Sequence, residues 1–168
     1  MKVYTIGHST RSLEDFLKIL KKFRIEVVID VRRFPSSKKF PWFNKEILSK
    51  ALRANNIEYI HFEKLGGYRK EGYLNFTKTK EFKNAIQELI QIISKKTSVI
   101  MCSELLWFRC HRKFIAQKLV ELGFKVIHVF DEKRQQEHKL KNKEINIKMG
   151  YVVWCDKKAR KFARLKNL

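Results

Sequence analysis

Val27-Val28-Ile29-Asp30-Val31-Arg32 contains three consecutive β-branched apolar residues followed directly by charged positions. An unbroken apolar run of this kind is typical of a strand that is buried on both faces of a sheet, as in parallel sheets covered by helices. The segment therefore predicts a buried strand that ends at Asp30, with polar side chains just beyond its carboxyl end.

Short apolar runs recur on both sides of this segment, and stretches with helical periodicity separate them. The further predicted strands are Val3–Ile6, Ile57–Ile60, Ser98–Met101 and Val126–Val129. The predicted helices are Leu13–Leu20 after the capping residue Ser12, Phe43–Ala54, Phe82–Ile93 and Phe114–Leu122. Strands that alternate with helices indicate right-handed βαβ crossovers. We therefore predict an α/β fold, a single three-layer domain with a mostly parallel sheet of about five strands.

The last part of the chain departs from this pattern. Residues 131–168 are dense in charge, and Val152-Val153-Trp154 is their one apolar cluster. We predict an α/β domain over residues 1–130 and a basic C-terminal extension over residues 131–168, packed on the same domain. The extension is expected to form two helices, or a helix and an edge strand.

The charge of the chain is strongly positive. Lys and Arg number 38 against 17 Asp and Glu, which gives a net charge of +21. Residues 131–168 contribute twelve basic against five acidic residues, +7, which leaves +14 on the first 130 residues. Because each neutralised phosphate releases counterions, a basic folded body favours a nucleic-acid partner. We expect nucleic acid as the partner, DNA ahead of RNA.

Membrane and secreted classes of protein are not expected. No apolar run approaches the roughly 20 residues that a membrane-spanning helix needs, and MKVYTIGHST at positions 1–10 lacks the apolar core of a signal peptide. Three cysteines are too few, and odd in number, for a disulfide framework. These features predict a cytoplasmic location. They leave the oligomeric state open.

Reactive side chains follow all five predicted strands. They are His8, then Asp30 and Arg32, then His61, then Cys102 and Glu104, and finally Asp131, with His128 near the end of the fifth strand itself. Ligands of open α/β sheets bind outside the carboxyl ends of the strands. Any one of these residues could simply cap a helix, but the set indicates a site. The candidate catalytic residues are Asp30, Glu104, His8, His111 and Cys110.

Two loops beyond the same edge combine cations with aromatic side chains, at residues 32–43 and 65–73. Such loops suit phosphate contact and base stacking, although their aromatic residues could instead pack the loops onto the domain. The candidate nucleic-acid-binding residues are Arg32, Arg33, Lys38, Lys39, Phe40, Trp42, Tyr68, Arg69 and Arg112.

The segment from Cys102 to Arg112 has several possible roles. Cys102, Cys110 and His111 could bind zinc, but their spacing matches no standard zinc motif and no fourth ligand is evident. Cys102 could be a nucleophile, although the intervening residues are bulky and Arg109 stands one position too far for a C-x5-R loop. The cysteines could also be buried structural residues beside a helix N-terminus. We assign no metal and no cofactor.

Several motifs together resemble a known family. They are Thr5-Ile6-Gly7-His8-Ser9, Asp30-Val31-Arg32 followed by Pro35 and Ser36, Leu65-Gly66-Gly67, and Cys102-x-Glu104 leading to Cys110-His111-Arg112. In this order they look like the family of domain of unknown function 488, over about residues 1–130. The resemblance implies one α/β domain with these strand-end residues as a site. The apolar segment 105–108 departs from the more acidic or proline-containing family pattern, which points to a different partner or substrate surface.

The leading hypothesis is a nucleic-acid-processing enzyme that acts on a base or glycosidic bond in DNA, as a hydrolase or glycosylase. Asp30 or Glu104 would orient a water or stabilise a cationic transition state, and His8 and His111 would transfer protons. The alternatives are a non-catalytic DNA- or RNA-binding protein and a cysteine-dependent enzyme acting on a small anionic or sulfur substrate.

Overall fold

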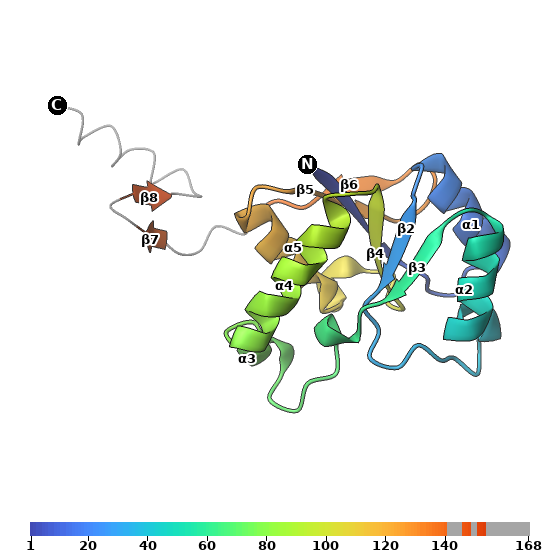
Figure 1. Ribbon diagram of the computed structural model, residues 1–168, viewed down its shortest axis with the longest axis horizontal. Helices are drawn as coiled ribbons and strands as arrows, with labels where there is room; N and C mark the ends of the chain where they lie inside the picture. Colours follow the sequence, from blue (N-terminus) through green and yellow to red (C-terminus); the bar gives the residue numbers. More distant parts are fainter. Residues whose placement is uncertain (141–145, 149–150, 154–168) are drawn as a thin grey trace. The chain divides into compact units, whose positions relative to one another are not determined.

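A computed structural model of the chain describes residues 1–140, 146–148 and 151–153. Residues 1–138 form one compact unit around a six-stranded sheet with the order β3-β2-β4-β1-β5-β6 (Figure 1). The strands are β1 (Lys2–Gly7), β2 (Val27–Asp30), β3 (Glu58–His61), β4 (Ser98–Cys102), β5 (Lys125–Val129) and β6 (Gln135–Glu137). The α-helices are α1 (Leu13–Lys22), α2 (Lys45–Ala54), α3 (Tyr73–Phe76), α4 (Lys80–Ile93) and α5 (Arg112–Glu121).

Helices cover both faces of the sheet, which confirms the predicted α/β fold. Phe16 and Leu20 of α1 and Leu48 of α2 pack in one apolar core, on one face. Leu89 of α4 and Ile115 of α5 pack in a second core, on the other face. Strands β1 to β5 are parallel and β6 is antiparallel to β5, so the sheet is mostly parallel as expected.

Local sequence signals explain where the long helices begin. The Ser12 hydroxyl accepts a hydrogen bond from the backbone N–H of Asp15, and Thr79 caps α4 in the same way. Helix α2 begins later than expected, because Pro41–Phe43 forms a separate 3-10 turn ahead of it. The short helix α3 has too few residues to show a periodicity, and the sequence did not predict it as a separate element.

The order of the strands creates a crevice above β4. Helices α1 and α2, which follow β1 and β2, lie on one face, whereas α5, which follows β4, lies on the other. Strand β4 lies between β1 and β2. The loop that follows β4 therefore leads to one face of the sheet, whereas the loops that follow β1 and β2 lead to the other face. This is the topological switch point at which open α/β sheets bind ligands.

The compact unit ends at His138 rather than at residue 130, because β6 completes the sheet. An edge strand, which was one of the two alternatives expected for the extension, is thus present as part of the domain. In the second unit, Asn146–Lys148 (β7) and Tyr151–Val153 (β8) form an antiparallel pair. The remaining residues, at which a helix was expected, lie outside the described ones, and packing of the extension on the domain stays a prediction. Within the described parts of the chain, no helix combines the length and apolar character that crossing a membrane requires.

Candidate functional site

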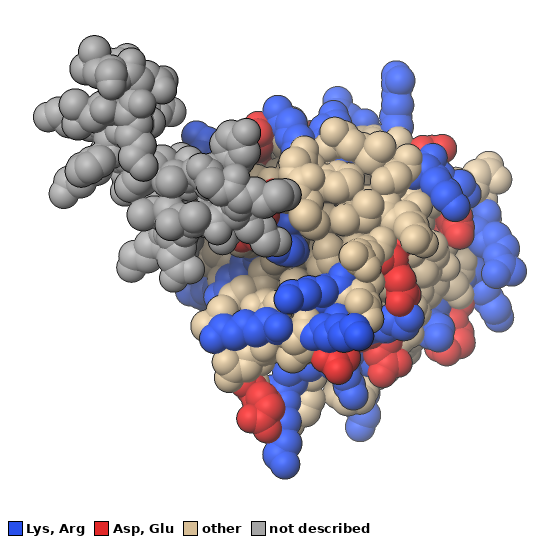
Figure 2. Space-filling view, turned by 60° about the vertical axis from the view of Figure 1, so that its left-hand side comes forward, with Lys and Arg blue, Asp and Glu red and all other residues tan. Residues whose placement is uncertain are grey.

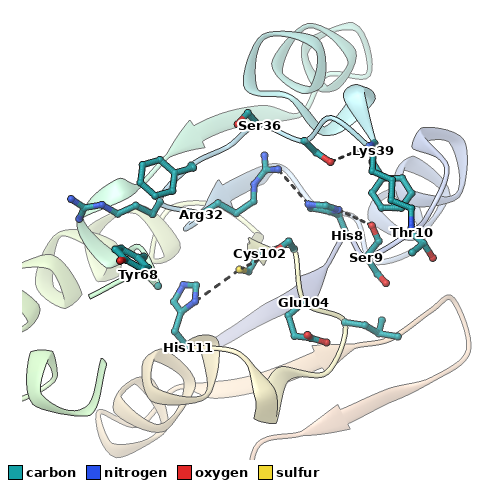
Figure 3. Close-up of a pocket in the computed structure, with 17 residues that line it drawn as sticks. His8, Ser9, Thr10, Arg32, Ser36, Lys39, Tyr68, Cys102, Glu104 and His111 are labelled. Carbon is teal, nitrogen blue, oxygen red and sulfur yellow. Dashed lines mark hydrogen bonds between the residues drawn. The ribbon is translucent and has the colours of Figure 1, made fainter. Parts of the chain in front are cut away.

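A cavity of about 580 Å³ opens at the crevice above β4. Its wall includes His8 after β1, Arg32 after β2, Glu104 after β4, His111 before α5, and Tyr68 (Figure 3). The structure thus brings together residues that are up to about a hundred positions apart in the sequence. Its volume lies within the range of about 300–1,000 Å³ that is usual for small-molecule sites.

Asp30 lies beneath the cavity, where it holds Arg32. The Asp30 carboxylate is fully buried and accepts hydrogen bonds from the Arg32 guanidinium at 2.6 to 3.1 Å. It also accepts from the Tyr59 hydroxyl at 2.7 Å, and burial together with Asp30 raises the pKa of Tyr59. Asp30 therefore has no place in the cavity wall. It positions Arg32, whose side chain does line the cavity.

His8 is a neutral side chain in this wall. It is 3% exposed, stacks on Phe43 with the ring centroids 4.1 Å apart, and its Nδ1 lies 3.0 Å from the carbonyl oxygen of Ser9. Nε2 lies 3.3 Å from the Arg32 guanidinium, which can only donate. Burial, and then the charge of Arg32, lowers the pKa of His8 to about 4. At neutral pH His8 thus accepts a hydrogen bond from Arg32 and carries no charge.

The state of His8 predicts that acid destabilises the fold. Its folded pKa of about 4 lies below the ordinary value of 6.5, so the unfolded chain takes up the proton first as the pH falls. The contribution of His8 to the free energy of unfolding is fully present above about pH 6.5 and is lost as the pH falls toward about 4. Between about pH 7 and about pH 5 the free energy of unfolding should fall by about 2 kcal/mol through this group. Urea unfolding of wild type and His8→Gln at both pH values tests this, and an equal pH dependence in the two proteins would contradict it.

Glu104 presents its carboxylate at the opposite wall. One carboxylate oxygen accepts the backbone N–H of Leu106 at 3.0 Å, and the side chain is exposed. The loop lies tightly against β1: a Cβ at Gly7 would overlap the carbonyl oxygen of Glu104. That carbonyl also accepts from the guanidinium of Arg112. Among the described residues that line the cavity, Glu104 is the one with a carboxylate.

Cations and aromatic rings surround the mouth of the cavity. Arg33, Lys39 and Phe40 come from the loop after β2, as does Phe34, which is 69% exposed. Tyr68 lies in the loop after β3 and is 75% exposed. These exposed rings, together with the cations beside them, are free to contact a ligand at the mouth of the cavity.

Two cysteines and a histidine meet at one side of the cavity. His111 Nδ1 lies 3.9 Å from Cys102 Sγ and 3.5 Å from Cys110 Sγ. A hydrogen bond from the Cys102 thiol to Cys110 lowers the pKa of Cys110 and raises that of Cys102, and the charge of Arg112 also lowers the pKa of Cys110. Cys102 and His111 line the cavity, whereas Cys110 lies behind them. The sulfur whose pKa is lowered, that of Cys110, therefore lies behind the cavity wall, where a substrate in the cavity would not contact it.

Four of the sequence-predicted binding residues lie elsewhere. Arg112 is 1% exposed and its guanidinium donates to backbone carbonyls and to Cys110 Sγ, so it braces the Glu104 loop and does not reach solvent. Trp42 is half-buried and donates to the carbonyl of Arg11. Arg69 donates to the carbonyls of two neighbouring residues, outside the cavity wall, and Lys38 is an exposed cation of the first loop.

Other strand-end residues also have structural roles, and neither Tyr59 nor Phe34 was among the site residues predicted from the sequence. His128 is buried against Thr5 and under the Trp107 ring, and Asp131 pairs with Arg134 at the surface. Tyr59, which holds Asp30, was missed because nothing in its local sequence marks it. The sequence predicted the loop that contains Phe34 but not the exposure of its ring. The position of Phe34 shortly after the end of β2 could have indicated that it lies near the site.

Comparison with known proteins identifies a family. The model of the family described as domain of unknown function DUF488 matches residues 12–119, which include Asp30-Val31-Arg32 and Cys102 through Arg112 and leave out Thr5–Ser9. No curated protein and no solved structure matches the chain. The match spans more than half of the chain and confirms the resemblance seen in its motifs, so this protein belongs to the DUF488 family.

Proposed function

We propose that this protein binds nucleic acid and hydrolyses the glycosidic bond of a single nucleotide held in the cavity, with DNA as the favoured substrate. The observation that carries the proposal is the pair of exposed rings, Phe34 and Tyr68, at the mouth of a cationic cavity. Enzymes that act on a base take it out of the stack and hold it in a pocket beside aromatic side chains.

The charge of the molecule supports the same partner. Figure 2 shows Lys and Arg side chains spread over the visible face of the domain, with Asp and Glu among them. The net charge of +21 would attract a phosphate backbone from any direction, and Arg33 and Lys39 at the cavity would hold the phosphates beside the bound nucleotide.

Glu104 is suited to activate water in this cavity. One of its carboxylate oxygens is fixed by the N–H of Leu106, which leaves the other to accept a proton from water. The water oxygen would form a bond to C1′ of the sugar as the bond from C1′ to the base nitrogen breaks. Glu104 would pass the water's proton to the departing base, and its charge would stabilise the cationic sugar in the transition state.

Removal of the exposed rings should weaken DNA binding without unfolding the protein. A base stacked on an aromatic side chain contributes about 1–3 kcal/mol, so Phe34→Ala and Tyr68→Ala should each lower affinity for a short single strand by that amount. Both rings are more than two-thirds exposed, so the melting temperature should change little. Fluorescence anisotropy with labelled oligonucleotides measures the affinity.

Phe108→Ala is the matched control, because Phe108 is also an exposed ring (46%) and lies outside the cavity wall. Its affinity should equal that of the wild type. If Phe34→Ala and Tyr68→Ala also bind like the wild type, the cavity mouth is not the stacking surface.

The activity itself is tested by incubation of the protein with labelled single strands and duplexes, undamaged and with modified bases, over a range of salt concentrations. Formation of abasic sites supports the proposal. Salt-dependent binding with every strand intact favours a binding protein without catalysis. If the protein does not bind even at low salt, nucleic acid is excluded as its partner. The reduced cysteines suit the reducing cytoplasm, where we place the protein.

A further inference from the structure

We infer that Cys102, Cys110 and His111 form a binding site for a divalent transition metal, with zinc as the preferred ion. This inference does not rest on the proposed nucleic-acid function. The sequence spacing of the three residues matches no standard zinc motif, but β4 and the start of α5 bring them together in the fold. Their ligand atoms all lie within 4.8 Å of one another.

The spacing of these atoms fits tetrahedral zinc. Bond lengths of about 2.0–2.1 Å to nitrogen and about 2.3 Å to sulfur, at tetrahedral angles, place a nitrogen and a sulfur ligand about 3.5 Å apart. The observed separations between His111 Nδ1 and the sulfurs are 3.5 Å for Cys110 and 3.9 Å for Cys102. Both nitrogen–sulfur separations are therefore close to those around a tetrahedral zinc ion.

The surroundings of the three residues match those of metal ligands. His111 Nε2 lies 3.1 Å from the carbonyl oxygen of Val31, so it carries the ring proton and leaves the Nδ1 lone pair facing the sulfurs. Arg112 Nε donates to Cys110 Sγ at 3.4 Å, an N–H···S contact that would support a thiolate ligand. Gly67 lets the loop pack closely against the imidazole, because a Cβ at that position would overlap His111.

The ligand set also indicates which ion it would hold. Two thiolates and one imidazole are soft or intermediate ligands, which favour zinc over magnesium or calcium. Two thiolates balance the charge of a divalent ion, so the buried site would be neutral apart from Arg112. Because Cys102 and His111 line the cavity and Cys110 lies behind them, the fourth position of the ion would face the cavity. Among the described residues the site has three protein ligands, and three ligands with one open position are typical of catalytic rather than structural zinc sites.

Cobalt is the probe for the first test, because Co²⁺ bound to thiolates in a tetrahedral site gives charge-transfer and intense d–d absorption bands. Titration of the reduced, metal-free full chain should give these bands with one Co²⁺ per chain, and added Zn²⁺ should displace it. Cys102→Ser, Cys110→Ser and His111→Asn should each weaken Zn²⁺ binding by more than about 100-fold, because the loss of even a supporting partner costs about 10–100-fold.

Cys155→Ser is the matched control, as it removes the third cysteine of the sequence and should leave the stoichiometry and the spectrum unchanged. X-ray absorption of the zinc-loaded wild type keeps the test decisive if a ligand variant does not fold, and it should show two sulfur ligands and at least one nitrogen. Binding with only oxygen and nitrogen ligands, Zn²⁺ binding that persists in both cysteine variants, or no Zn²⁺ binding by the fully reduced protein would overturn the inference.

Discussion

Glu104→Gln should slow base release by about 10²–10⁴-fold, the usual contribution of a positioned acid or base. The physical reason is that Gln preserves the acceptor for the N–H of Leu106 but cannot take a proton from water. Affinity for DNA should stay equal or rise slightly, because the substitution removes a negative charge from the cavity wall. Single-turnover assays of abasic-site formation, with anisotropy for the affinity, separate the two effects.

Glu46→Gln is the control for this experiment, because Glu46 is an exposed carboxylate in the first turn of α2 and lies outside the cavity. Its rate of base release should match that of the wild type. A Glu104→Gln enzyme with wild-type turnover would remove Glu104 from the mechanism. Weaker DNA binding with no change in turnover would assign Glu104 to binding alone.

Asp30→Ala should lower the free energy of unfolding by about 3–5 kcal/mol, the cost of leaving one partner of a buried ion pair alone. Arg32 is 5% exposed, and in this variant its charge would stay buried without the carboxylate that accepts three of its hydrogen bonds. The Tyr59 hydroxyl would also lose its acceptor. Urea unfolding by circular dichroism measures the change, and Asp30→Asn provides a milder variant if the alanine protein does not fold.

A double variant shows whether the loss of stability comes from the unpaired charge of Arg32. Replacement of both partners, as in Asp30→Leu with Arg32→Met, should restore much of the stability, because a buried ion pair is often replaced by apolar residues at little cost. If Asp30→Ala lowers the free energy of unfolding by less than about 1 kcal/mol, the ion pair does not stabilise the fold. The catalytic role that the sequence predicted for Asp30 would then be the better explanation.

The position of the site in the fold could be predicted from the sequence. The role of each residue in the site could be predicted less well. Apolar runs such as Val27–Ile29 identify the strands, and polar residues that follow a strand must emerge at its carboxyl end. This reasoning placed His8 and Glu104 correctly at one edge of the sheet. It could not distinguish Glu104, whose side chain is exposed, from Asp30, whose side chain is buried, because both follow a buried strand directly.

The sequence by itself determined the α/β fold, the parallel sheet and the family, since each depends on local patterns of apolar residues or on short motifs in order. Only the tertiary structure decided which polar groups meet. Tyr59 holds Asp30 from a neighbouring strand, Arg112 turns inward to the Glu104 loop, and His111 lies against two cysteines. Such contacts arise where segments distant in the chain pack together, and burial then decides which charges are paired inside the protein and which face a ligand.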